Sequence, residues 1–231
     1  MKSYGQFCPY ALTAEIVGER WTPLVLRELV LGRTRFNDIH RGLPRMSPTL
    51  LVRRLATLEA AGLIDRCRTG RNRFEYRLTD AGREFGPMVA MLAEWGKRWL
   101  PPTLSKIQAD PDLIMWDMHR RMNLEALPEA RTVIRFEFSD QSKAKRCRWI
   151  VAEPPEIDFC ITDPGFEVDV YVTTDSRTIT WVWYGDIPLA DAIAEGAIDV
   201  HGPRALCRAF PSWLLLNELA AVPRRNPLRT A

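Results

Sequence analysis

The stretch Ser47–Arg66, SPTLLVRRLATLEAAGLIDR, is the feature that most restricts what this chain can fold into. Ser47 suits the N-cap of a helix and Pro48 its first position, while Gly62 predicts its end. Between them, leucines repeat at helical spacing, so one side of the helix must be buried: Leu50, Leu51, Leu55 and Leu58. The same helix carries adjacent arginines, and these need a polar partner on its other side.

The residues on either side of this helix predict a winged helix-turn-helix. Pro9 indicates a first short helix, Thr22 is a candidate cap for a second that Gly32 closes, and Pro44 stops a third. The turn PRM then joins the third helix to the helix after Ser47. Downstream, GLIDRCR and RFEYRLT alternate like strands around the turn TGRN, which predicts a hairpin wing.

One longer helix is expected to begin at Thr79 or Asp80 and to reach the Pro-Pro pair at 101 and 102. Its apolar stripe is too wide for one small winged helix to bury. We therefore expect a homodimer interface on this helix, formed by Phe85, Met88, Leu92, Trp95 and Trp99.

The second half of the chain changes to an α+β pattern. The segment PDLIMWDMHRRM predicts a helix, and four strand candidates follow: RTVIRFEFS, RCRWIVAE, IDFCIT and FEVDVYVTT. The segment SRTITWVWYG is open between a strand, because of its β-branched residues, and a helix, because of Asp175 and Gly185. PLADAIAEG and PRALCRAFPSWLLLNEL predict helices, and the tail VPRRNPLRTA has a disordered composition.

The 231 residues therefore predict two domains and an α+β fold class overall. Residues 1–100 would form the DNA-binding and dimerisation domain, and residues 101–231 a second domain. Residues 1–100 contain 17 Lys and Arg against 10 Asp and Glu, a net charge of +7, whereas the remainder carries −4. Such a contrast indicates different partners for the two halves.

The basic charge is concentrated between Arg33 and Arg77, a stretch that contains eleven arginines and four acidic residues. Arginine suits phosphates and guanine edges, so we expect a double-stranded DNA partner. For a single basic helix, the simpler interpretation is that its arginines only contact water. The adjacent turn and wing favour the interpretation that they contact DNA. On the helix after the turn, the expected contacts are Ser47, Pro48, Thr49, Val52, Arg53 and Arg54. Arg54 flanks the leucine side, so a pair with an acid is the alternative for it. On the wing they are Arg68, Arg71, Asn72 and Arg73, chiefly to phosphates.

Five segments follow one another along the chain: CPY, VGERWTPLVLRELVLGRTRFNDI, LPRMSPTLLVRRLATLEAAGLIDR, EYRLTDAG and LAEWG. In this order they resemble the motifs of the HxlR family of winged helix-turn-helix regulators, which is related to the MarR group. The resemblance covers about residues 8–100. It implies a homodimeric transcriptional regulator, dimerised through its first and last helices, which we expect to be a repressor on a pseudo-palindromic operator. More weakly, VYVTTD and YGDIPLADAIAEGAIDVHGP resemble a sterol-carrier-protein type of lipid-binding domain, which implies a sheet with helices over an apolar cavity.

The resemblance also gives two candidates for an input signal. Cys8 precedes a helix start, where the helix dipole favours a thiolate, and some HxlR relatives sense oxidants at this position; capping or packing is the simpler role. An apolar small-molecule effector could occupy the second domain, although such aromatic density is more often ordinary core. The candidate pocket residues are Phe136, Phe138, Trp149, Phe159, Trp181, Trp183, Phe210 and Trp213.

Other function classes receive little support from the sequence. The five cysteines and three histidines are scattered without ligand spacing, so we expect no metal and no cofactor. Paired carboxylates, a Cys-His set or a phosphate loop cannot be identified at catalytic spacing, so we expect no enzyme. No apolar run approaches the length of a membrane span, and we expect a cytoplasmic protein without a membrane partner. Two alternatives stay open. One is a lipid or apolar-ligand carrier whose basic domain binds non-specifically, and the other is a DNA-binding protein whose second domain only supports the dimer.

Overall fold

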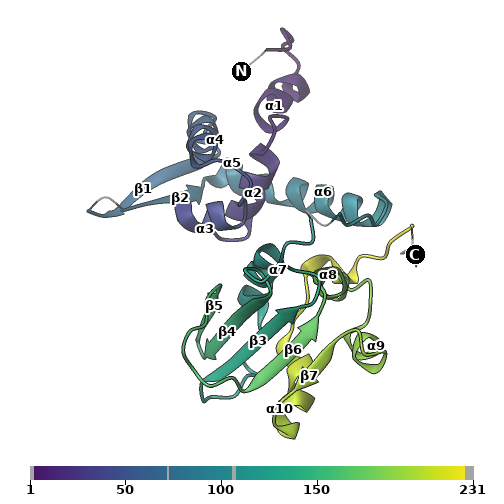
Figure 1. Cartoon of the computed structure of the whole chain (residues 1–231). Helices are drawn as coiled ribbons and strands as arrows, with labels where there is room; N and C mark the ends of the chain where they lie inside the picture. The colour runs from purple at the N-terminus through teal and green to yellow at the C-terminus, as the bar shows by residue number, and fades with distance from the viewer. Residues whose placement is uncertain (1–2, 72, 106–107, 227–231) are drawn as a thin grey trace. The chain divides into compact units, whose positions relative to one another are not determined.

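The computed structural model describes residues 3–71, 73–105 and 108–226. The chain divides into two compact units, Met1–Trp95 and Gly96–Ala231, whose elements are labelled in Figure 1. The first unit contains α1 (Pro9–Val17), α2 (Thr22–Val30), α3 (Phe36–Arg41), α4 (Pro48–Ala60), β1 (Ile64–Gly70), β2 (Arg73–Leu78) and α5 (Asp80–Glu84). Helix α6 (Gly86–Trp99) begins in the first unit and ends in the second.

The first unit is a winged helix-turn-helix, as the sequence predicts. Strands β1 and β2 pair antiparallel from Ile64 opposite Leu78 to Gly70 opposite Arg73. The chain just before α3 joins them, because the Tyr76 amide donates to the Thr34 carbonyl over 2.7 Å. Side chains from the helices and the wing share one core, whose buried members are Val25, Leu26, Leu29, Ile39, Leu43, Met46, Leu51, Leu55, Leu58, Leu63, Ile64 and Tyr76.

Two details of the helices differ from the sequence expectations. Helix α2 is not capped by Thr22, because Thr22 lies inside the helix and the N-cap is Trp21, at a left-handed φ of 79°. The single long helix expected from Thr79 is two helices, α5 and α6, divided at Phe85. Pro87 explains the division, since it has no N–H to donate to the carbonyl four residues earlier. Thr79 does cap α5, accepting a bond from the Gly82 amide.

The second unit is a mixed five-stranded sheet with helices. Its strands are β3 (Thr132–Phe138), β4 (Cys147–Glu153), β5 (Glu156–Cys160), β6 (Val170–Thr174) and β7 (Asp199–His201). They lie in the order β5-β4-β3-β6-β7, with β3 and β6 parallel and the other neighbours antiparallel. The helical elements are α7 (Pro111–Met118), η1 (His119–Arg121), α8 (Ser176–Trp183), α9 (Leu189–Ala194), α10 (Arg204–Ala209), η2 (Phe210–Trp213) and η3 (Glu218–Ala221).

The segment that the sequence left open between strand and helix is α8. Asp175 caps it by accepting hydrogen bonds from the amides of Arg177 and Thr178, both at 2.9 Å. Gly185, at a φ of 71°, follows its end. A single helix over residues 203–219 is not formed, because Pro211 falls within the segment and the chain continues as the shorter elements α10, η2 and η3.

Candidate nucleic-acid interface

Helix α4 presents two chemically different sides. Leu51, Leu55 and Leu58 are fully buried in the core of the first unit. The opposite side is exposed and carries Thr49, Val52, Arg53 and Ala56, at the i, i+3, i+4 and i+7 spacing that places residues on one helical face. We call these four residues the outer face of α4.

The start of α4 is fixed by a cap. Ser47 Oγ accepts a hydrogen bond from the Leu50 amide at 3.3 Å, and Pro48 occupies the first helical position. Ser47 and Pro48 are both exposed. In a helix-turn-helix, the first residues of the second helix of the motif reach the base edges, and the amide groups at this end favour a negatively charged partner.

The two adjacent arginines of α4 have different surroundings. Arg54 has a side chain only 12% exposed, because its Nη2 pairs with Glu19 Oε2 at 2.6 Å and its Nε donates to the Arg20 carbonyl at 3.1 Å. Arg54 therefore links α4 to the turn after α1 and pairs with an acid, which is the alternative that the sequence left open for it. The Arg53 side chain is exposed and has no hydrogen-bond or ion-pair partner among the described residues.

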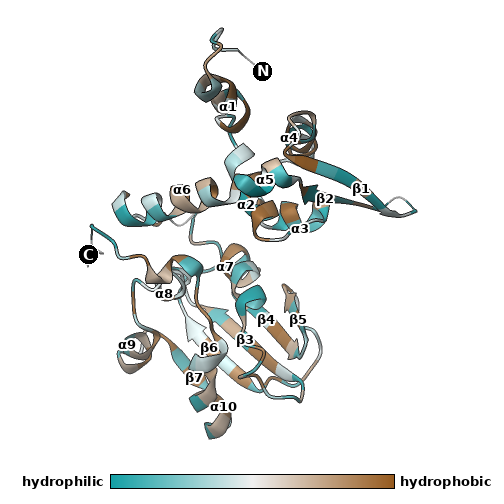
Figure 2. Cartoon of the chain, turned by 180° about the vertical axis from the view of Figure 1, so that it is seen from behind, coloured by the Kyte–Doolittle hydropathy of each residue, from teal (hydrophilic) through white to brown (hydrophobic). Residues whose placement is uncertain are grey.

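The wing carries exposed basic groups near its tip. Arg68, Arg71 and Arg73 are all exposed, and among the described residues only Arg68 of the three has a side-chain hydrogen bond within the wing, from its Nε to the Gly70 carbonyl at 3.3 Å. Asn72, which the sequence also suggested, lies outside the described residues. Hydrophilic colours cover most of β1 and β2 in Figure 2, as expected of a hairpin that faces water or a polar partner.

The base of the wing contains an arginine that the sequence reading passed over. The guanidinium of Arg66 lies 4.0 Å from the centre of the Phe74 ring on the opposite strand, a cation–π contact that fixes its position. On the same strand as Phe74, the Arg77 side chain donates a hydrogen bond to Glu75 at 2.8 Å, and this bond raises the pKa of Arg77. The register of the hairpin is the signal that could have predicted this contact. Phe74 lies opposite Arg68, and Arg66 is two residues from Arg68 on the same face of the strand, so Arg66 and Phe74 are diagonal neighbours.

Helix α6 exposes most of the apolar residues expected at a dimer interface. The side chains of Met88, Leu92, Trp95 and Trp99 are 44 to 63% exposed, and Met91, which the prediction omitted, is 68% exposed. Phe85 differs, because it precedes α6 and packs against the core of the first unit. An apolar helix surface of this kind is costly to leave in water.

Cys8 lies at the N-cap of α1, as the sequence predicts, with an exposed side chain that makes no capping hydrogen bond. Exposed apolar side chains surround this end of the chain, Phe7 and Tyr10 among them.

The aromatic residues proposed as one pocket do not form one group. Phe136, Phe138, Trp183, Phe210 and Trp213 are fully buried in the main core, and Phe159 packs against its edge. Trp149 belongs to a separate cluster with Val133 and Val151, because alternate β4 residues face opposite sides of the sheet. Trp181 lies under the guanidinium of Arg224 at 5.5 Å. The proposed set is thus corrected to the core members alone.

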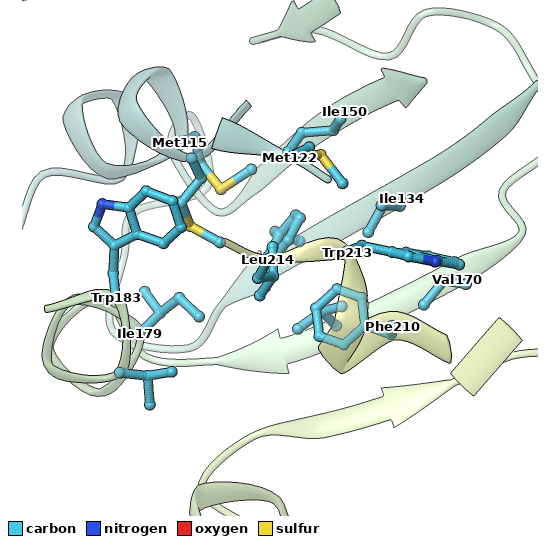
Figure 3. Close-up of a cluster of buried hydrophobic side chains, with 14 of the residues drawn as sticks. Met115, Met122, Ile134, Ile150, Val170, Ile179, Trp183, Phe210, Trp213 and Leu214 are labelled. Carbon is cyan, nitrogen blue, oxygen red and sulfur yellow. The ribbon is translucent and has the colours of Figure 1, made fainter. Parts of the chain in front are cut away.

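The core members make a continuous aromatic contact. Phe210 lies 6.3 Å from Phe136 and 5.9 Å from Trp213 between ring centres. Figure 3 shows Phe210 and Trp213 beside Val170 and Ile134, with Trp183 at the other end of the cluster near Met115. Trp213 Nε1 is buried and has no hydrogen-bond partner among the described residues.

A buried charge cluster in the second unit was not predicted. Lys97 donates to Asp186 and, at 2.9 Å, to the Tyr184 carbonyl, and the two charged side chains are only 3% and 6% exposed. Arg224 holds both oxygens of Asp186, at 2.7 and 3.0 Å. Burial lowers the pKa of Lys97, and its bond to Asp186 opposes that shift. Arg224 belongs to the tail expected to be disordered, so that expectation was wrong as far as residue 226.

Metal sites and membrane spans are two further features to consider. Among the described residues, no group of three or more His, Cys, Asp and Glu side chains could hold a metal ion. The described helices are each too short or too polar to cross a bilayer.

Comparison with known proteins identifies relatives that match part of the chain. The model of the family described as HxlR-like helix-turn-helix matches residues 16–104. An uncharacterized HTH-type transcriptional regulator of Mycobacterium tuberculosis is 45% identical over 89 residues, which are 38% of this chain and 56% of that protein. The chain thus spans just over half the length of that relative. The uncharacterized HTH-type transcriptional regulator YvaP of Bacillus subtilis is 32% identical over 101 residues, 42% of this chain and 94% of that protein.

Among solved structures, the redox regulator HypR in its reduced form is similar, with 31% identity and a TM-score of 0.37. The alignment covers 38% of this chain and 90% of that one.

Proposed function

This chain belongs to the HxlR-like helix-turn-helix family, and on that premise we propose that it is a transcriptional regulator that binds double-stranded DNA through residues 1–100. The observation that carries the proposal is the outer face of α4, where Arg53 is exposed and has no side-chain partner among the described residues, while Leu51, Leu55 and Leu58 on the other side are fully buried. Such a helix can enter a major groove without disturbing the core that supports it.

The basic groups divide into two roles. Arg53 is suited to a guanine edge, because a bidentate arginine contact to guanine is worth about 1–3 kcal/mol of discrimination against other bases. Arg71 and Arg73, at the tip of the wing, are suited to phosphates, which supply affinity and its dependence on salt but no sequence information. Ser47 and Thr49 complete the contact at the start of α4.

The decisive test is a salt-resolved titration of the whole protein against its own upstream intergenic duplex and against a shuffled duplex. Arg53→Ala should reduce binding to the native duplex about 10-fold or more and leave shuffled binding nearly unchanged. Arg71→Ala should weaken binding to both duplexes and lower the slope of log affinity against log salt by about 1. Equal affinity of the wild-type protein for both duplexes would contradict the proposal.

We further propose that the protein acts as a homodimeric repressor on a pseudo-palindromic operator. The exposed apolar residues of α6 and those near Cys8 support a dimer, because a second copy would cover both. Two recognition helices related by a two-fold axis require half-sites about 34 Å apart. A promoter–reporter assay with the gene deleted should show raised transcription; unchanged or lowered transcription would argue against repression.

For residues 101–231 we propose a regulatory role with an apolar small molecule as effector. Helices over a sheet and an aromatic interior support the resemblance to sterol-carrier-type domains, and the unpartnered Trp213 Nε1 would offer a ligand one hydrogen bond. A panel of hydrophobic compounds should include some that raise the melting temperature and change operator affinity. Lipid transfer between vesicles without any operator binding would instead favour the carrier alternative.

Thiol modification is the second candidate signal. The exposure of Cys8 at a helix N-cap supports it. Treatment with a mild oxidant should then alter operator affinity of the wild-type protein and leave Cys8→Ser unaffected. An equal response in both proteins would exclude Cys8 as the sensor.

A further inference from the structure

Val52 is an apolar side chain in an unusual place. It lies on the outer face of α4, 55% exposed, although the buried side of the same helix is already filled by leucines. Valine is also a poorer helix former than alanine, because its branched side chain loses rotamer freedom in a helix. Neither packing nor helix stability therefore explains a valine at this position.

The neighbours of Val52 give this part of the helix a definite chemistry. Thr49 and Ala56 lie one turn before and after it on the same face, so methyl groups follow one another along the helix. Arg53 is the adjacent residue and the cation of this face, with no side-chain partner in the part of the chain that the structure describes. Since χ1 of a helical valine is almost always one rotamer, the two Val52 methyl groups are held in a fixed direction before any partner binds.

Only one base edge in the major groove suits such a surface. Thymine presents a 5-methyl group there, whereas cytosine presents its N4 amino group, a donor that valine cannot satisfy. Covering a polar donor with an apolar side chain costs the hydrogen bonds that the donor makes to water. We propose that Val52 contacts the 5-methyl group of a thymine in the base pair next to the guanine that Arg53 contacts, and so selects thymine over cytosine in each half-site.

This inference rests on the proposed DNA-binding function, and its test separates the two. Footprinting on the upstream intergenic duplex first locates the half-sites. Each thymine within them is then replaced singly by deoxyuridine, which removes the 5-methyl group and leaves every hydrogen-bonding group in place. We expect one position per half-site to be sensitive, with about a fourfold loss of affinity for one half-site and about 15-fold when both half-sites are changed.

Protein variants connect the sensitive position to Val52. Val52→Ala should bind the thymine and deoxyuridine duplexes with nearly equal affinity at that position, while Val52→Thr, which keeps one of the two methyl groups, should retain part of the difference. Because Val52 is exposed, both variants should fold as the wild type does. Ile161→Ala is the matched control, since it also trims an exposed branched apolar side chain but lies in the second unit.

Each outcome has a separate meaning. Specific binding without a methyl-sensitive thymine would overturn the inference and leave the proposed function standing. Methyl sensitivity that persists unchanged in Val52→Ala would overturn the assignment to Val52. No preference of the wild-type protein for the native duplex over a shuffled one would overturn the proposed function itself.

Discussion

Arg53 and Arg54 are adjacent and identical residues with very different surroundings. The Arg53 side chain is exposed and has no partner among the described residues, whereas Arg54 is hydrogen-bonded to Glu19 and to the Arg20 carbonyl. Helical spacing places Arg54 beside the leucine side, so its lesser exposure could be anticipated. The identity of its partner could not, because Glu19 lies 35 residues away in sequence.

The pair predicts opposite effects of the same substitution. Arg54→Ala should lower the free energy of unfolding by about 1–2 kcal/mol, since it removes a partly buried charged hydrogen bond, and leave discrimination between duplexes intact. Arg53→Ala should leave urea unfolding within about 0.5 kcal/mol of the wild type and lose discrimination. If Arg54→Ala lost discrimination between duplexes and Arg53→Ala lost stability, these assignments would be contradicted.

Asp186 gives a second prediction at this scale. It is buried between Lys97 and Arg224, so Asp186→Ala leaves two cations without their anion and should cost about 3–5 kcal/mol. Lys97→Met should cost less, because Arg224 still neutralises Asp186. Denaturant unfolding monitored by the tryptophans would rank the two; a larger loss for Lys97→Met would contradict this account.

Among the elements, those with an end signal in the sequence were predicted best. The structure confirms two helix starts, at the caps Ser47 and Thr79, and two helix ends, which are followed by Gly32 and Gly62. The start of α2 was misplaced because a left-handed tryptophan as N-cap has no sequence signal. The aromatic residues of β3 and β4 were grouped wrongly for another reason. Both faces of these strands are largely buried, so alternation of polar and apolar residues cannot tell the two faces apart.

Asp175 decides the conformation of α8 and can be tested directly. Its carboxylate accepts two amide bonds and a third from the Thr178 hydroxyl at 2.5 Å. Asp175→Ala should therefore destabilise the protein by about 1–2 kcal/mol, and Asp175→Asn or Asp175→Ser should recover most of the loss. Thermal melts of the wild type and the three variants would measure this; an Asp175→Ala protein as stable as the wild type would mean that the cap contributes nothing.

For the whole molecule, α6 connects the proposed assembly to the proposed binding. Leu92→Glu places a charge in the middle of its exposed apolar surface and should convert the dimer to monomers, as measured by light scattering at micromolar concentration. Operator affinity should fall together with dimerisation, because a monomer binds through one α4 helix and loses the gain in affinity that comes from binding two half-sites at once. Ile161→Glu is the control, an equally exposed apolar residue outside α6; a dimer that survives Leu92→Glu would place the interface elsewhere.

The last turn of α6 depends on residues that lie far from it in the sequence. Lys97 is hydrogen-bonded to Asp186, its carbonyl accepts from Arg224, and the Arg98 carbonyl accepts from the Arg225 amide. A chain cut after residue 100 would therefore lose more than the second unit, because Lys97 would lose its anion and the last carbonyls of the helix would lose their donors.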